Sequence, residues 1–109
     1  MTAIALVETG GNDFKVGKDG ELGRLQTKKI VVDDIYRIYG IKYNHRSCTD
    51  YHVSQIIFYL YINYYLTKNK LPFTVENIAL LWNGGPDMDG SKQYVKKVKK
   101  KYKELVESS

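Results

Sequence analysis

The stretch YHVSQIIFYLYINYYLTK, residues Tyr51–Lys68, constrains the fold of this chain more than any other part of it. Its length and composition predict a helix, and apolar or aromatic side chains occupy nearly every side of that helix. A helix that is apolar all round has to be covered on most sides by other segments. The chain has 109 residues, so we expect one domain in which the other helices pack around this central one.

Shorter helices are predicted on both sides of the central one, each by its own start or stop signal. Glycines end the first two, Pro72 breaks the chain after the central helix, and Thr74 and Ser91 are suitable N-caps for the last two. The segment NDFKVGKDGELGRLQT, residues 12–27, predicts an irregular loop or a short β-hairpin. The fold class is therefore mainly α. The expected helices are Thr2–Thr9, 28–39, 51–68, 74–82 and 91–106, with a polar connection over 41–50.

The last predicted helix carries the lysine-rich sequence VKKVKKKYK, in a chain whose net charge is +5. Such a cluster can bind nucleic acid or an anionic membrane. The apolar residues of this segment recur at helical spacing, however, which predicts a packed helix with the lysines on its solvated face. The expected apolar stripe consists of Tyr94, Val95, Val98, Tyr102, Leu105 and Val106.

Several functional classes are disfavoured by what the chain lacks. The single cysteine, Cys48, cannot form an internal disulfide, and we expect a small half-buried side chain rather than a catalytic thiol. His45 and His52 have no cysteine ligands nearby for zinc, and the DMDG sequence has Val98 where a calcium loop needs glutamate. We therefore expect no metal and no cofactor. We also expect no membrane span, because no apolar run reaches about 18 residues. The amino-terminal sequence also lacks the features of a signal peptide.

Glu8 is the candidate catalytic residue. It stands at the end of the apolar helical run AIALVE, where the helix carries partial negative charge. That charge and burial beside apolar neighbours both raise the pKa of a carboxyl group, and a carboxylic acid that stays protonated can act as a general acid. The neighbouring Thr9 hydroxyl could orient the carboxyl. The local sequence alone favours an ordinary exposed glutamate in a terminal turn over a catalytic acid.

Four motifs in order resemble those of lysozyme-like lytic transglycosylases and of invertebrate-type lysozymes with their phage relatives. ALVETGGND is similar to the glutamate-serine-glycine motif, and GELGRLQT to the glycine-x-x-glutamine segment that follows it. NIALLWNGGP resembles the later motif that contains asparagine and glycine, and SKQYVKKV the threonine-x-x-tyrosine-valine stretch. The resemblance covers residues 3–98 and implies a small lysozyme-like helical domain that cleaves peptidoglycan glycan strands.

The resemblance also implies a role for individual residues. Glu8 matches the catalytic acid, Gln26 the glutamine that lines the groove behind it, and Tyr94 a tyrosine whose hydroxyl points toward the acid. Asn83 matches an asparagine whose amide binds the sugar, with glycines that let the backbone approach the substrate. Thr9 replaces a serine and keeps its hydroxyl. Trp82 replaces a tyrosine, and it either stacks on a sugar or wedges its helix into the core.

A hydrolase of this kind needs a second carboxylate, and Asp19 and Glu21 are the candidates from the sequence. Their spacing from Gly23 differs from that of the enzymes that the chain resembles. A lytic transglycosylase needs no such group, because a hydroxyl of the substrate attacks in place of water. The sequence therefore leaves hydrolysis and transglycosylation open.

Three other functions remain to be weighed against cleavage. The chain could be an inactive wall-binding module, a structural part of a virion or a larger secretion assembly, or a basic domain that binds nucleic acid through its lysines. The intact Glu8 disfavours the first, and we expect no nucleic-acid partner. The resemblance to phage relatives predicts action at the bacterial cell wall, either after release from the host cytoplasm or from a virion.

Overall fold

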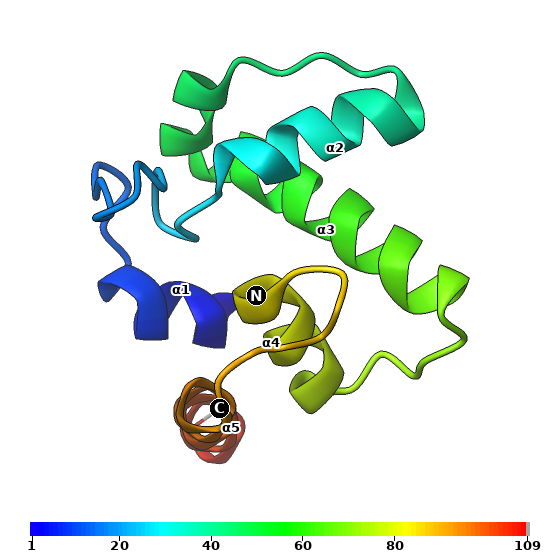
Figure 1. Ribbon diagram of the computed structural model, residues 1–109. Coiled ribbons are helices and arrows are strands. Elements are labelled where there is room, and N and C mark those ends of the chain that lie inside the picture. The colour runs from blue at the N-terminus through cyan, green and yellow to red at the C-terminus, as the bar shows by residue number, and fades with distance from the viewer. Residues whose placement is uncertain (109) are drawn as a thin grey trace.

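The computed structural model describes residues 1–108, and its helices follow the pattern expected from the sequence (Figure 1). Within these residues, strand-like pairing is limited to isolated bridges that join Val16 to Leu22 and Leu22 to Thr27. The mainly α fold class is confirmed, and the segment after the first helix is an irregular loop. The elements are α1 (Thr2–Thr9), α2 (Lys29–Tyr39), the 3-10 helix η1 (His45–Thr49), α3 (Tyr51–Lys68), α4 (Val75–Gly84) and α5 (Lys92–Glu107).

Helix α3 is central, as its composition predicts. It packs against α2, η1 and α4, and Figure 1 shows it crossing the middle of the molecule. Asp50 begins the helix, because its carboxylate accepts hydrogen bonds from the N–H groups of His52 and Val53. One narrow stripe stays exposed, and it includes the apolar side chains of Ile56 and Tyr59. The buried residues of α3 are Ser54, Ile57, Phe58, Tyr61, Ile62, Tyr65 and Leu66.

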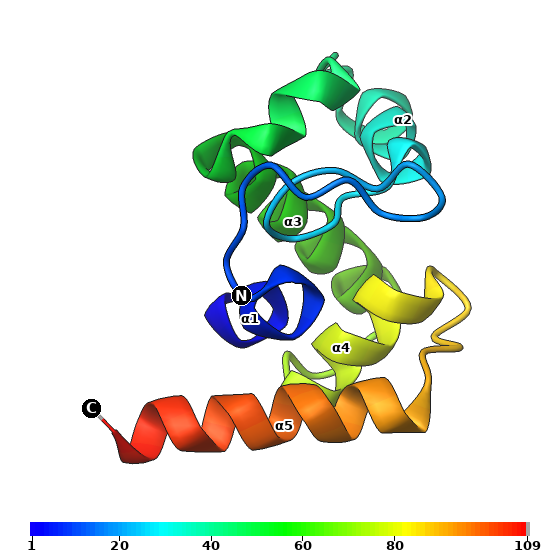
Figure 2. The ribbon, with the colours of Figure 1, turned by 90° about the vertical axis from the view of Figure 1, so that its left-hand side faces the viewer.

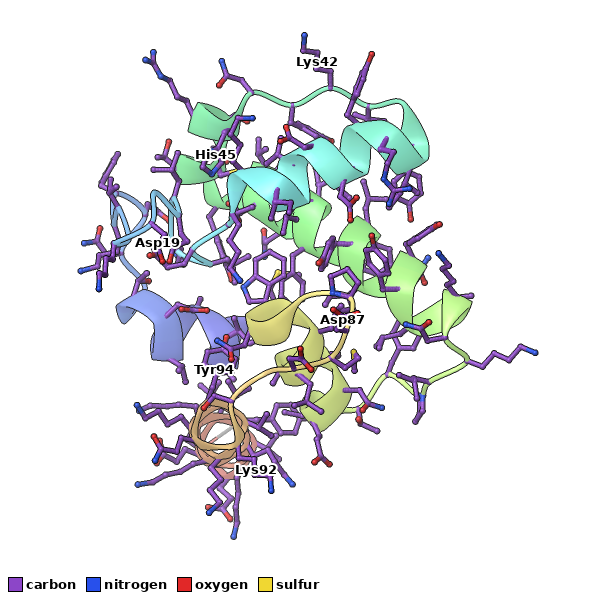
Figure 3. The ribbon with its side chains drawn as sticks, viewed as in Figure 1. Asp19, Lys42, His45, Asp87, Lys92 and Tyr94 are labelled. Atoms are coloured by element: carbon purple, nitrogen blue, oxygen red, sulfur yellow. The ribbon has the colours of Figure 1, made fainter. Side chains whose placement is uncertain are left out.

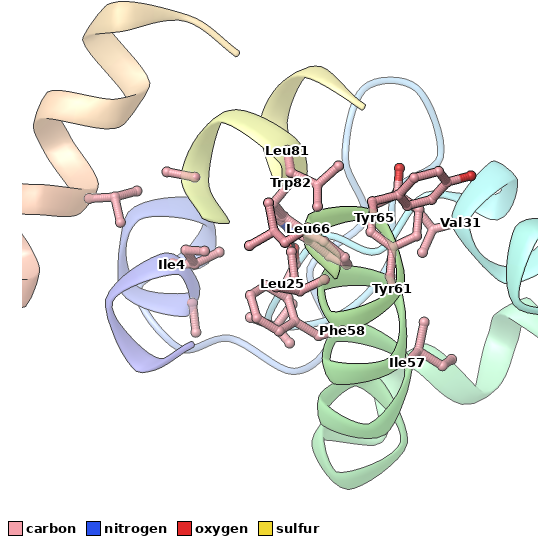
Figure 4. Packing of buried hydrophobic residues seen from close by; sticks show 14 of the residues in the cluster. Ile4, Leu25, Val31, Ile57, Phe58, Tyr61, Tyr65, Leu66, Leu81 and Trp82 are labelled. Atoms are coloured by element: carbon pink, nitrogen blue, oxygen red, sulfur yellow. Dashed lines mark hydrogen bonds between the residues drawn. The ribbon is translucent and has the colours of Figure 1, made fainter. Parts of the chain in front are cut away.

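Trp82 of α4 lies at the centre of the core (Figure 4). Its ring centroid is 4.7 Å from that of Phe58 and 5.9 Å from that of Tyr61, both on α3. The indole Nε1–H donates a hydrogen bond of 3.0 Å to the carbonyl of Leu25 in the loop 10–28. Because a buried donor without a partner costs about 1–3 kcal/mol, this bond ties the loop to the core.

The loop 10–28 has little regular structure but several fixed contacts. Arg24 forms two hydrogen bonds with the Asp13 carboxylate, of 2.9 and 3.1 Å, and its guanidinium lies 4.0 Å from the ring centroid of Tyr51. Gly23 has a positive φ of 81°, and a Cβ atom there would lie 1.9 Å from the Cys48 carbonyl oxygen. The loop can approach η1 this closely only because residue 23 has no side chain.

Helix α5 runs beneath α1 and α4, and its last turns extend past α4 (Figure 2). Ser91 begins it, with its hydroxyl accepting a hydrogen bond from the Tyr94 N–H. Val95 and Val98 are buried and all seven lysines of the helix are exposed, so the prediction of a packed helix with a basic face is confirmed. The apolar stripe is narrower than predicted, since Tyr102 and Val106 are 50% and 55% exposed.

Two other sequence expectations need correction. The connection 41–50 contains the 3-10 helix η1, which starts where the Asn44 side chain accepts a hydrogen bond from the Arg46 N–H. Helix α4 continues two residues beyond Trp82, because Gly84 remains helical and Gly85, with a φ of 82°, is the residue that ends it. The sequence marks a glycine stop here without showing which glycine leaves the helix.

The contact between Gly23 and Cys48 yields a stability prediction. Gly20 and Gly23 both have positive φ values, of 85° and 81°, but a Cβ atom at Gly20 would meet nothing within 4 Å. We expect Gly20→Ala to lower the free energy of unfolding by about 1–2 kcal/mol through backbone strain alone. Gly23→Ala adds a collision with backbone and should cost about 3 kcal/mol or more. Urea unfolding of both variants measures the difference, and equal losses would contradict the steric argument.

Candidate active site around Glu8

A hydrogen bond between Glu8 and Tyr94 forms the centre of the candidate site. The Tyr94 hydroxyl donates to Glu8 Oε2 at 2.9 Å and joins two residues that are 86 positions apart in the chain. Glu8 lies in the last turn of α1, and Tyr94 lies in the first turn of α5, from which it points toward α1 (Figure 3). Burial and the neighbouring Glu8 raise the pKa of Tyr94, so its hydroxyl remains a donor across the physiological range.

The environment of Glu8 keeps its carboxyl protonated to higher pH than that of an ordinary glutamate. Burial is the largest effect and raises its pKa. The hydrogen bond from Tyr94 and the positive charge of Lys28 lower the pKa, while the negative charge of Glu21 raises it again. The net direction is upward. A raised pKa of this kind is what a carboxyl group needs to act as a general acid.

Lys28 approaches Glu8 from the start of α2. It is the N-cap residue of that helix, and its Nζ donates a hydrogen bond of 3.3 Å to the Asn83 carbonyl oxygen at the end of α4. The ammonium group is thereby held between two helices, close enough to Glu8 to act on its charge. No motif in the sequence identifies this lysine, because its position depends on packing between residues 55 apart.

The two candidates for a second carboxylate differ in their relation to Glu8. The charge of Glu21 acts on Glu8, whereas Asp19 is not among the groups that do so. Asp19 is exposed at the tip of the loop, and its backbone N–H donates a hydrogen bond of 2.8 Å to Glu21 Oε1. The structure therefore brings Glu21 to the site and leaves Asp19 outside it as a residue that holds Glu21.

Gln26 lies beside Glu21 and is held rigidly. Its backbone has a positive φ of 53°, and its side-chain Nε2 donates to the carbonyls of Lys15 and Gly23 at 3.1 and 3.0 Å. A Cβ atom built on Gly17 would lie 2.4 Å from Gln26 Oε1 and 2.9 Å from Glu21 Oε2. The two side chains therefore converge on the space that Gly17 leaves open. Gln26 is also buried, and its role as a groove-lining residue stays a prediction.

Thr9 does not orient the carboxyl of Glu8, contrary to the sequence expectation. Its hydroxyl lies within hydrogen-bonding distance of the carbonyls of Ala5 and Arg24, at 3.1 and 2.9 Å, and accepts from the N–H groups of Gly11 and Asn12. One hydroxyl supplies one donor and two acceptor positions, so the local backbone uses its full capacity. Thr9 therefore joins the end of α1 to the loop.

Trp82 and Asn83 also have structural roles. The indole of Trp82 is 5% exposed and packs against α3, so the core alternative applies and not a stacked sugar. Asn83 Oδ1 accepts a hydrogen bond of 2.8 Å from the Ser91 N–H and closes the turn between α4 and α5. Its side-chain Nδ2 has no protein partner among the described residues and can donate to a ligand.

Two of the glycines near Asn83 lie against the protein's own backbone. A Cβ atom on Gly84 would lie 2.1 Å from the Gly90 nitrogen, and one on Gly90 would lie 2.7 Å from Leu80 Cα. The backbone that approaches Gly84 is therefore that of the turn 85–90, and the backbone that approaches Gly90 is that of Leu80 in α4. The space beside Gly84 is therefore filled by the protein's own backbone, whereas a Cβ atom on Gly85 would meet nothing within 4 Å, so close approach of a sugar stays a prediction for Gly85 alone.

A cavity of about 380 Å³ adjoins the site between α2, α3 and the end of α4. Asp34 lies on its wall, where its carboxylate accepts hydrogen bonds from Tyr65 and Arg37. Lys28 also lines the cavity and so connects it with Glu8. The Asp34–Arg37 spacing predicts an ion pair on one helix, but nothing in the sequence places it at a cavity. The other lining residues are Ile30, Val31, Tyr61, Tyr65, Trp82, Gly84, Gly85 and Pro86.

Residues that could support other chemistry do not gather elsewhere in the described part of the chain. Cys48 is fully buried, more than predicted, and burial raises the pKa of its thiol to about 11, which disfavours a reactive thiolate. His45 binds the Thr27 carbonyl at 2.8 Å, and His52 is exposed. Across residues 1–108, no group of three or more His, Cys, Asp or Glu side chains could hold a metal ion. None of the helices formed by these residues has the length and apolar character needed to cross a membrane.

Comparison of the chain with protein-family models, with curated proteins and with solved structures finds no match. The resemblance to lysozyme-like enzymes therefore remains a prediction from the four sequence motifs. The site described above is an independent observation, since it follows from contacts between α1, α5 and the loop 10–28.

The electrostatic relation of Glu8 and Glu21 can be tested by titration. We expect Glu21→Gln to lower the pKa of Glu8, because a like charge beside the buried carboxyl is removed. Asp19→Asn is the matched control and should leave that pKa unchanged, since the backbone N–H that holds Glu21 is retained. Carbon-13 NMR of the Glu8 carboxyl measures both. If Asp19→Asn shifts the pKa as much as Glu21→Gln does, the assignment of Glu21 to the site fails.

The raised pKa of Glu8 also predicts how stability depends on pH. Between the ordinary glutamate pKa and the raised value, the folded protein binds more protons than the unfolded chain, so stability falls as pH rises through this window. We expect Glu8→Gln to be more stable than the wild type at pH 7, with the gain vanishing near pH 4. Glu76→Gln is the control, because Glu76 is exposed in the first turn of α4, where negative charge is favourable. Chemical unfolding at both pH values measures the gain, and a gain of equal size at pH 4 would contradict the argument.

Proposed function

We propose that this chain cleaves the β-1,4 bond between N-acetylmuramic acid and N-acetylglucosamine in peptidoglycan, with Glu8 as general acid and base. The observation that carries the proposal is the hydrogen bond between Tyr94 and the half-buried Glu8, whose pKa is raised. The four motifs in the sequence independently assign the same two residues to a lysozyme-like site. The resemblance to phage relatives extends the proposal to an enzyme that reaches the wall from the host cytoplasm or from a virion.

The first step follows from the hydrogen bond that Tyr94 makes. Its hydroxyl donates to Glu8 Oε2, which therefore acts as the carbonyl oxygen of the protonated acid. The proton resides on Oε1 and is delivered to the glycosidic oxygen as the C1–O bond breaks. The leaving sugar departs with a hydroxyl group, and positive charge develops at C1 of the other sugar. The Glu8 carboxylate that remains is stabilised by Tyr94 and by the charge of Lys28.

Two routes complete the reaction. In a lytic transglycosylase, a hydroxyl of the N-acetylmuramic acid attacks its own C1, and the Glu8 carboxylate takes the proton that this hydroxyl loses. In a hydrolase, a water molecule attacks C1. Where the second carboxylate stabilises the charge at C1, the Glu8 carboxylate takes the proton that the water loses; where the second carboxylate activates the water, it takes that proton itself. Of the two candidates from the sequence, Glu21 is the one whose charge acts on Glu8. The second route therefore assigns this role to Glu21 and none to Asp19.

Digestion of purified peptidoglycan, with the products read by mass, tests the proposal. We expect soluble fragments from the wild type and a loss of about 10²–10⁴-fold in rate for Glu8→Gln, because the variant has no proton to deliver. Glu76→Gln is the matched control and should digest like the wild type, because its side chain is exposed on α4. Products about 18 Da lighter than hydrolysed fragments would identify transglycosylation, which adds no water.

The remaining outcomes decide between the alternatives. Hydrated products whose release is lost in Glu21→Gln but kept in Asp19→Asn would support hydrolysis with Glu21 as the second carboxylate. Full activity of both variants would remove the second carboxylate from the mechanism. Release of no fragment by the folded wild type, from several types of wall, would overturn the proposed activity and favour a wall-binding or structural role.

A further inference from the structure

The net charge of the molecule resides on one helix. Helix α5 carries seven of the 17 basic residues and two of the 12 acidic ones, so its own net charge equals the +5 of the whole chain. Basic and acidic residues balance over the rest of the sequence. All seven lysines are exposed, and Figure 3 shows side chains that end in nitrogen radiating from α5 away from the body of the molecule. These residues, Lys92, Lys96, Lys97, Lys99, Lys100, Lys101 and Lys103, form what we call the lysine face.

The lysine face carries more positive charge than the solvated side of a packed helix needs. Glu104 and Glu107 pair with Lys101 and Lys103 near the end of α5, and in residues 1–108 the other five lysines have no ion pair. Several of them stand three or four positions apart on the helix, as Lys96 and Lys100 do, and like charges at this spacing destabilise a helix. Lysines near the start of a helix also oppose its dipole. A bound polyanion would relieve both costs.

A hollow in the surface brings three residues of the lysine face against α1. Between α1 and α5 lies a depression of about 330 Å³, lined by Leu6, Val7, Lys97, Lys100, Lys101 and Glu104. Val7 directly precedes Glu8, and Lys97 lies one turn after Tyr94 on α5. The depression is thus close in sequence to Glu8 on α1 and to Tyr94 on α5, although neither residue of that pair lines it.

The geometry points to a phosphate-bearing anionic polymer of the bacterial cell wall as the partner of the lysine face, a choice of source that rests on the proposed function. Val95 and Val98 of α5 are buried, and the large apolar side chains that the helix exposes, Tyr102 and Val106, make no continuous apolar face to insert into a membrane. The face contains no arginine, so it lacks the planar forked group that reads bases or stacks on them. Lysines act as point charges along α5, which spans about 24 Å, and such an array fits a flexible chain of phosphates.

The test compares two triple variants that lose the same charge. One replaces Lys96, Lys97 and Lys100 by glutamine, and the control replaces the exposed Lys18, Lys42 and Lys70. The probe is poly(glycerol phosphate) extracted from a Gram-positive wall, with binding measured over a range of salt concentrations. We expect the first variant to bind more weakly at low salt, and the slope of log affinity against log salt to become shallower by about two to three. The control should keep the slope of the wild type.

The first variant should also unfold at the same or a higher urea concentration, because repulsion within α5 is reduced. Equal binding by both triple variants, or equal losses in both, would overturn the proposal. Tighter binding of a DNA duplex, or of vesicles with anionic lipid, than of poly(glycerol phosphate) at the same salt would assign the face to that partner instead and also overturn it.

A separate arm distinguishes this proposal from the proposed activity. Peptidoglycan freed of its phosphate polymer should be digested equally by the wild type and the first triple variant, whereas intact walls should be digested more slowly by the variant. Glu8→Gln should bind poly(glycerol phosphate) like the wild type. Polymer binding without digestion by the wild type would reject only the proposed activity, and digestion of stripped walls without polymer binding would reject only the lysine face.

Discussion

The indole of Trp82 joins three parts of the chain, and the position of the candidate site depends on it. Its ring packs on Phe58 and Tyr61 of α3, while its N–H binds the Leu25 carbonyl in the loop 10–28. Leu25 directly precedes Gln26, so the bond that satisfies a core tryptophan also sets where the loop side chains of the site lie. An irregular loop with two isolated bridges has little backbone pairing of its own. The conformation of the loop 10–28 therefore depends on its contacts with the helical core.

The Glu8 carboxyl has both a raised pKa and a fixed orientation. A cation that fixed its orientation would at the same time lower its pKa. A lysine or arginine bonded to Glu8 would hold the carboxyl in place but would favour its charged form. Tyr94 is a neutral donor, and burial keeps it so. It fixes Glu8 Oε2 through one hydrogen bond and lowers the pKa less than burial raises it. Lys28 acts on the same carboxyl through its charge, with its Nζ bonded to the Asn83 carbonyl.

Local signals in the sequence predict much of the fold, and contacts between distant segments explain most of what they miss. The helix starts at Asp50, Thr74 and Ser91 depend on side chains within three residues, so caps and composition suffice to find them. Glu8 and Tyr94 could be named from motifs. The roles of Thr9 and Gly84 could not, because the Arg24 carbonyl and the Gly90 backbone reach them only in the folded chain. The positions of Lys28 and Asp34 also cannot be predicted from the sequence, because their partners Asn83 and Tyr65 are distant in the chain.

Helix α5 contributes Tyr94 to the candidate site and the lysine face to the surface. The helical repeat of about 3.6 residues places these side chains on different sides of the helix. The turn that directs Tyr94 inward, with Val95 and Val98 behind it, directs Lys96 and Lys99 to solvent. Among the described cationic side chains, Lys28 is the one whose charge acts on the pKa of Glu8. The lysines of α5 are not among the causes of that pKa shift. Exposed charges are screened within about 10 Å at ordinary salt, which is consistent with this separation. Substitutions on the lysine face therefore change what the molecule attracts without changing the acid that would perform the chemistry.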